Sequence, residues 1–116
     1  MNTVAGRKLN RPTGARFGLL RNLATSLLRH EQIQTTHAKA KEVGRFAEGI
    51  LAQAKRQTLA SRRRVAAEIT DKAVQKKIYD ILVPRYKTRA GGCTRVFRLA
   101  NRTGDNAEMA LIKLVQ

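Results

Sequence analysis

The stretch GGCTRVFRLANRTGDNAEMALIKLV, residues 91–115, decides the fold class, because its pattern differs from that of the helices expected before it. Two runs rich in β-favouring residues, near 93–101 and 108–115, flank a turn-forming Gly-Asp-Asn at 104–106. This arrangement predicts a two-stranded hairpin. The side of the hairpin expected to pack against helices includes Phe97, Leu99, Ile112 and Leu114.

Upstream of the hairpin, apolar residues recur at helical spacing. Residues 13–30 and 37–56 each carry such a stripe, which predicts two amphipathic helices. The segment between them, EQIQTT at 31–36, lacks that spacing and favours a brief strand, after which Thr35 or Thr36 is expected to cap the second helix. The stripes consist of Phe17, Leu20, Leu23, Ala24, Leu27 and Leu28, and of Ala40, Val43, Ala47, Ile50, Leu51 and Ala54.

Two shorter helices are expected next. The first spans 58–69 and contains the run Arg62-Arg63-Arg64. The second starts after Asp71, a good N-cap residue, and should end at Pro84, which cannot donate a backbone hydrogen bond. Its buried face is predicted to contain Val74, Ile78, Ile81 and Leu82.

The elements together predict an α+β fold: helix, short strand, three helices and the C-terminal hairpin, with the helices packed on one face of a small mixed sheet. A chain of 116 residues suits one domain. Residues 1–12 contain Arg7, Lys8 and Arg11 but no apolar periodicity. We therefore expect a basic N-terminal arm over 1–12 and a single compact domain over 13–116.

The charge of the chain indicates a polyanionic partner. It has 24 Lys and Arg against 8 Asp and Glu, a formal net charge of +16, and such self-repulsion is relieved by an anion. Nucleic acid and an anionic membrane surface are both candidates. No acid occurs in residues 1–30 or 81–104, and the arginine run lies between these windows. Three separate basic regions suit an irregular phosphate surface better than a flat membrane.

Several classes of function lack the residues they need. The only cysteine, Cys93, excludes an intramolecular disulfide, and with two histidines it cannot complete a four-ligand Cys/His zinc site. His30 fits a helix C-terminus, and His37 fits either a phosphate contact or an ordinary first-turn position. Neither a nucleotide-binding glycine loop nor an apolar run long enough for a membrane span is present. No enzyme activity, cofactor or small-molecule substrate is expected.

Four segments of the sequence resemble those of a known protein family. They are GRKLNR at 6–11, LLRNLATSLLRHEQIQTTHAKAKEV at 19–43, GGCTRVFRL at 91–99 and RTGDNAEMALIKLV at 102–115. These segments are similar to the bacterial large-subunit ribosomal proteins of family seventeen. The resemblance covers essentially the whole chain from Gly6 onward. The resemblance implies a structural, non-enzymatic component that binds large-subunit rRNA near the outer end of the peptide exit tunnel, beside neighbouring ribosomal proteins. Both a bacterial and an organellar ribosome fit this resemblance, and the absence of an evident transit peptide favours the bacterial cytoplasm.

A free-standing architectural DNA- or RNA-binding protein is the alternative, because the same charge would serve it. In either case the contacts are expected from Arg and Lys, which bind phosphate, while stacking on bases is expected to be minor because aromatic residues make up only 4% of the chain. The predicted RNA-binding residues are Arg7, Lys8, Arg11, Arg16, Arg21, Lys39, Lys41, Arg45, Arg62, Arg63, Arg64, Arg85, Lys87, Arg89, Arg95, Arg98 and Arg102.

Overall fold

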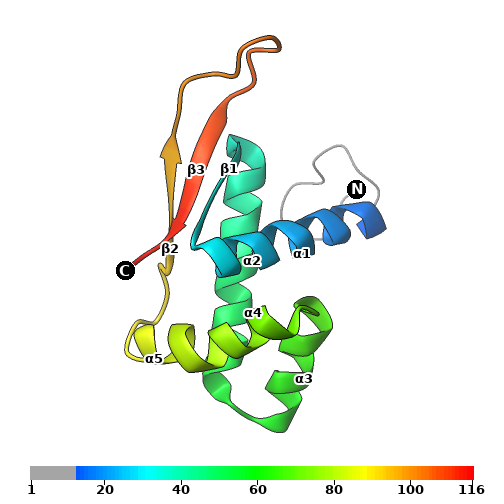
Figure 1. Cartoon of the computed structure of the whole chain (residues 1–116), viewed down its shortest axis with the longest axis vertical. Coiled ribbons are helices and arrows are strands. Elements are labelled where there is room, and N and C mark those ends of the chain that lie inside the picture. Colours follow the sequence, from blue (N-terminus) through cyan, green and yellow to red (C-terminus); the bar gives the residue numbers. More distant parts are fainter. Residues whose placement is uncertain (1–12) are drawn as a thin grey trace.

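The computed structural model describes residues 13–116, and the predicted arm over 1–12 lies outside the described residues. The predicted order of elements and the α+β class are confirmed (Figure 1). The elements are α1 (Thr13–His30), β1 (Gln32–Thr36), α2 (His37–Arg56), α3 (Leu59–Glu68), α4 (Lys72–Lys77), the π-helix η1 (Ile78–Leu82), α5 (Val83–Arg85), β2 (Thr94–Arg98) and β3 (Met109–Leu114).

The three strands form one sheet in the order β1-β3-β2, and both pairings are antiparallel. The prediction of a mixed sheet is therefore wrong. The hairpin makes β2 antiparallel to β3, and β1 runs in the same direction as β2 but joins the opposite edge of β3. Because β1 and β2 do not touch, no parallel ladder forms.

Helices α1 and α2 cover one face of this sheet, as predicted (Figure 1). α2 contributes the longest buried stripe, and its Gly44 lies where the helix approaches the sheet most closely. A Cβ at Gly44 would lie 3.1 Å from Cδ1 of Ile112 and 3.2 Å from Oγ1 of Thr94. The absence of a side chain at this position therefore lets α2 lie directly against β2 and β3. The core also includes Leu27 and Leu28 of α1.

The hairpin presents a different face to the helices from the one predicted. Ile112 and Leu114 are buried as expected, but Phe97 is 48% exposed and Leu99 is also exposed. The register pairs Phe97 with Leu111 rather than with Ile112. Because side chains alternate across a strand, Phe97 then points away from α2, and the smaller Val96 packs against the core instead.

Pro84 does not end the helix at its own position, since the helix continues through α5 to Arg85. In a regular α-helix the proline ring would crowd the carbonyl four residues earlier. The turn before it is instead widened into η1, where Val83 N–H donates to the Ile78 carbonyl. The extra residue in this turn shifts the helical phase, so Ile81 is 48% exposed rather than buried, while Tyr86 enters the core.

Two helix starts differ in how they are capped. Asp71 begins α4 as predicted, because its Oδ1 accepts from the backbone N–H groups of Ala73 and Val74 at 2.9 and 3.2 Å. Thr36 is the N-cap residue of α2, but its side chain makes no capping hydrogen bond. The N–H of His37 instead donates to the carbonyl of Glu108 at 2.8 Å. A carbonyl group next to β3 thus accepts the hydrogen bond of the first N–H group of α2.

Candidate nucleic-acid interface

The arginine run of α3 forms the clearest basic surface. A capping box between Thr58 and Ser61 begins this helix, and all three arginines that follow are exposed. The guanidinium of Arg62 lies 4.4 Å from the centre of the Tyr79 ring. None of the three arginines pairs with an acid in residues 13–116. Their charge is therefore available to an anionic ligand.

A second basic surface lies on the first half of α2, where Lys41 and Arg45 are exposed and Lys39 is half-buried. These three side chains also lack an acid partner within the described part of the chain. The opposite side of α2 is in the core. The helix therefore presents cations along the side that its packing leaves open.

The third basic surface follows α5, where Lys87 and Arg89 are exposed. Lys55 Nζ donates to the carbonyls of Tyr86 and Arg89, which ties this turn to the end of α2. Gly92, with φ of 66°, takes the left-handed conformation that glycine tolerates best. The hydrogen bonds from Lys55 thus hold the backbone of this turn, while the side chains of Lys87 and Arg89 are exposed to solvent.

Arg85 was predicted to belong to that third surface, but the structure assigns it a partner inside the protein. Its two terminal nitrogens donate to both carboxylate oxygens of Glu31, at 2.6 and 3.3 Å. Lys77 Nζ lies 3.1 Å from the same carboxylate. The three side chains are largely shielded from solvent. Arg85 therefore joins α5 to the α1–β1 connection and is not a free cation.

The environment of Glu31 favours the ionised form of its carboxyl group. The hydrogen bond from Arg85 holds the pKa of the Glu31 carboxyl below its ordinary value, and partial burial opposes this effect. Glu31 also adopts a φ of 66°, directly after α1. The ion pairs and the hydrogen bonds hold the chain at the point where it leaves the helix and enters the sheet.

We expect the substitution Glu31→Gln to destabilise the fold by about 1–2 kcal/mol at neutral pH, since it removes charge-assisted hydrogen bonds that are only partly exposed. Because the folded pKa is lowered, wild-type stability from this group is complete above the ordinary glutamate pKa and is lost as pH falls through the folded value. Urea melts of both proteins at several acidic pH values would test this. The difference between the two proteins should shrink across that window, and a difference that does not change with pH would contradict the assignment.

Five further predicted residues have partners or positions that the sequence did not reveal. Arg16 is 2% exposed and its guanidinium lies 4.9 Å from the Phe17 ring centre, so burial keeps it from an external ligand. Arg21 bonds Glu68 at 2.9 Å, Arg102 bonds Asp105 at 2.6 Å, and Arg98 lies 3.7 Å from Glu108. These three pairs are on the surface, where phosphate can compete for the arginine. Arg95 is exposed on β2.

Three predicted residues, Arg7, Lys8 and Arg11, lie outside the described residues. Other exposed cations were missed. Three of them lie on α2 and α4, helices in which scattered acids suggested ordinary ion pairing, and the fourth lies on β3. Helical spacing could have found Lys72 and Lys76, which lie one turn apart. The missed residues are Arg56, Lys72, Lys76 and the half-buried Lys113.

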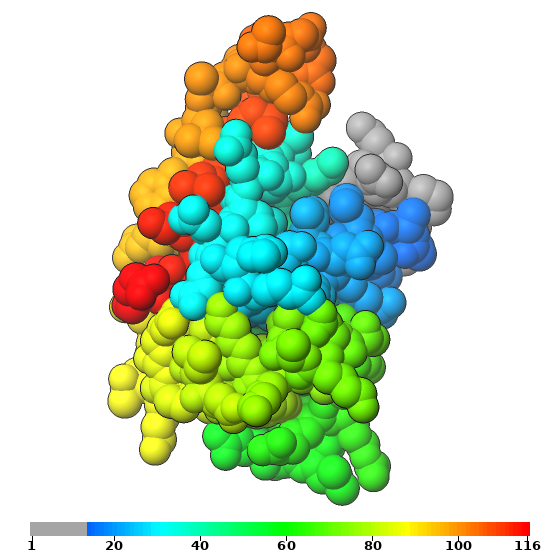
Figure 2. All heavy atoms as spheres, in the orientation of Figure 1, coloured from blue at the N-terminus to red at the C-terminus, as the bar shows by residue number. Residues whose placement is uncertain are grey.

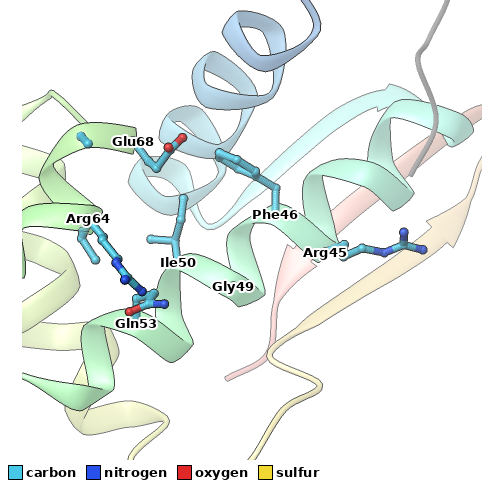
Figure 3. Close-up of a pocket in the computed structure, with 9 residues that line it drawn as sticks. Arg45, Phe46, Gly49, Ile50, Gln53, Arg64 and Glu68 are labelled. Atoms are coloured by element: carbon cyan, nitrogen blue, oxygen red, sulfur yellow. The ribbon is translucent and has the colours of Figure 1, made fainter. Parts of the chain in front are cut away.

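A groove of about 420 Å³ lies between α2 and α3, but its lining does not form a catalytic centre (Figure 3). Phe46, Ile50 and Val65 make its wall apolar, and Arg64 reaches across it toward Gln53. Its only acid, Glu68, already bonds Arg21. The lining residues include no nucleophile beside a general base.

Other chemistry is equally restricted within residues 13–116. Burial raises the pKa of the Cys93 thiol, which opposes formation of the reactive thiolate. No group of three or more His, Cys, Asp or Glu in this part of the chain could hold a metal ion. None of its helices is long and apolar enough to cross a membrane.

Fold and surface together define a class: a small, strongly basic α+β protein whose exposed cations are spread over several faces, as in proteins built into ribonucleoprotein assemblies. The model of the family described as ribosomal protein L17 matches residues 19–115. The chain belongs to this family. Its members are structural ribosomal components, which confirms the prediction that the chain is not an enzyme.

Curated relatives agree with the family model. The large ribosomal subunit protein bL17 of Caldanaerobacter subterraneus subsp. tengcongensis is 50% identical over 109 residues, which cover 94% of this chain and 97% of the relative. The protein of the same name from Desulfitobacterium hafniense is 49% identical, with 97% of this chain and 100% of the relative covered. That of Anaeromyxobacter sp. (strain K) is also 49% identical, over 97% of this chain and 71% of the relative. The similarity thus spans nearly all of this chain.

Proposed function

We propose that the chain is built into the bacterial large ribosomal subunit, binds large-subunit rRNA there through its basic surfaces, and lies near the outer end of the peptide exit tunnel. The observation that carries rRNA binding is the exposed run Arg62, Arg63 and Arg64, which has no acid partner among the described residues. The large-subunit assignment follows the names of the relatives. The position near the tunnel rests on family resemblance alone.

The geometry supports a bridging role for the protein. The longest dimension of the structure is 45 Å, with the hairpin loop at one end and α3 at the other (Figure 1). The hairpin tip projects beyond the helices, as the orange spheres of Figure 2 show. Cations at two distant ends can contact two separate RNA segments. A rigid protein core between them would then fix the distance between those segments.

The mode of RNA recognition follows from the side chains. Duplex RNA has a deep, narrow major groove, so proteins contact mainly its phosphates, its 2′-hydroxyl groups and its shape. The planar guanidinium of arginine binds a phosphate through two hydrogen bonds. Exposed arginines on a helix therefore suit a ribose-phosphate backbone and give little base specificity. Affinity of this kind should depend strongly on salt.

We expect a tagged copy of the chain, expressed in a bacterium, to sediment with large ribosomal subunits through a moderate salt wash. Hydroxyl-radical footprinting of those subunits should protect large-subunit rRNA, and crosslinkers on the surface of the protein should reach nascent chains only once these approach the tunnel exit. Sedimentation with the nucleoid would overturn the ribosomal assignment in favour of an architectural DNA-binding protein. If the protein crosslinked to nascent chains of no length, the proposed position near the tunnel exit would be wrong, but the ribosomal assignment would stand.

A further inference from the structure

The sheet has a second face, turned away from α1 and α2, that is not part of the three basic surfaces described above. The register places Phe97 opposite Leu111 and Arg95 opposite Lys113 on this outer face. Leu99 continues the row, because its N–H donates to the carbonyl of Met109 at 2.9 Å. The outer face thus combines apolar side chains at one end with cations at the other.

Arg95 and Lys113 form a like-charge pair directly across two strands, an arrangement that is destabilising by itself. Neither of them forms an ion pair within residues 13–116. On β1 the outer-face neighbours are Gln32, beside Lys113, and Gln34, beside Leu111. The outer-face positions of the three strands contain no acid. An anion placed between Arg95 and Lys113 would relieve their repulsion.

Phe97 lies next to this charged pair and is half exposed. A hollow of about 150 Å³ adjoins it, lined by Arg95, Phe97, Lys113 and residues 114–116. An exposed aromatic ring on an open sheet face, with cations within reach of a neighbouring phosphate, is how several RNA-binding sheets hold unpaired nucleotides. The amide side chains of Gln32 and Gln34 add hydrogen-bonding groups that can meet a base edge or a ribose.

We propose that the outer face of the sheet binds single-stranded RNA, with a base stacked on Phe97 and the adjacent phosphate held between Arg95 and Lys113. The inference rests on the proposed rRNA binding and assigns a second mode of contact to a different surface. The apolar row by itself would suit a protein partner equally well. The unneutralised like-charge pair and the absence of acids favour a polyanion.

A single substitution makes the stacking visible. The chain contains no tryptophan, so Phe97→Trp introduces the sole indole, whose fluorescence an unpaired base should quench on stacking. Titration with an unstructured oligoadenylate is expected to quench this signal, and a blunt RNA duplex is expected to quench it far less. Ile81→Trp is the matched control, because Ile81 is also 48% exposed but lies on η1, away from the sheet. Its signal should not respond to the oligoadenylate.

Phe97→Leu keeps an apolar side chain but removes the ring. It should weaken oligoadenylate binding roughly fivefold to a hundredfold, the usual range for loss of one stacked base, while Phe97→Tyr should retain affinity. Melting temperatures should match wild type, since Phe97 is outside the core. Equal oligoadenylate affinity for Phe97→Leu and wild type, or unchanged fluorescence of Phe97→Trp, would overturn the proposal and leave the face to a protein partner.

The two RNA proposals can fail separately. If the Phe97 variants bind normally while loss of the α3 arginines abolishes rRNA binding, the stacking site is wrong and rRNA binding stands. If neither set of variants changes the affinity for any RNA, both proposals fall.

Discussion

Replacing Arg62, Arg63 and Arg64 together with glutamine should lower the affinity for a large-subunit rRNA fragment roughly a hundredfold at physiological salt, and should reduce the slope of log affinity against log salt by about 2 to 3. Each phosphate contact releases somewhat less than one counterion, so three lost contacts account for both numbers. Folding should change little, because all three side chains are exposed and pair with no acid in residues 13–116.

A matched control for this prediction is Arg85→Gln. Arg85 bonds both oxygens of Glu31, so its loss should lower the melting temperature but leave the salt slope unchanged. Binding isotherms at four or five salt concentrations, with circular dichroism on the same samples, would separate the two behaviours. An unchanged slope for the triple variant would mean that the α3 arginines face solvent or protein, and it would remove the observation that carries the proposed function.

The contrast between Arg85 and the α3 arginines shows what the sequence could predict about the site. Glu68 lies four residues after Arg64 on α3 but bonds Arg21 instead, and within residues 13–116 no acid pairs with the three α3 arginines. Glu31 is 54 residues from Arg85, and tertiary packing, with α4 against α1 and with η1 and α5 against α2, brings them together. Arg16 is a similar case, since its helical pattern predicted an outward-facing cation but only 2% of the residue is exposed. Charge patterning therefore predicts the polyanionic partner but not which cations are free to bind it.

The elements themselves were predictable because their signals are local. Helical spacing of apolar residues and the Asp71 cap act over one or two turns, and both appear in the structure. The face of the hairpin was not predictable in this way. On β2 both Val96 and Phe97 can pack against a core, and it is the register with β3 that places Val96 opposite the buried Ile112. A shift of one residue reverses every side chain.

The alternation of β3 side chains between the two faces of the sheet gives the prediction with the largest expected effect on stability. Ile112 lies at the centre of the middle strand, is fully buried, and contacts α2 where Gly44 allows close approach. Ile112→Ala should therefore cost about 2–5 kcal/mol of unfolding free energy, because it removes buried methyl groups and leaves a cavity between rigid neighbours. Such a loss is a large part of the stability of a small domain.

Leu111→Ala is the control that compares truncation on the outer face of the sheet with truncation on the inner face. Leu111 is the preceding residue on the same strand but points to the outer face beside Phe97, where it is only partly buried. Its truncation should cost less than about 1 kcal/mol, in the range of partly exposed positions. Urea denaturation followed by circular dichroism would give both values. If the two variants lost equal stability, the outer face would be as tightly packed as the inner one, and it could not offer an open surface to RNA.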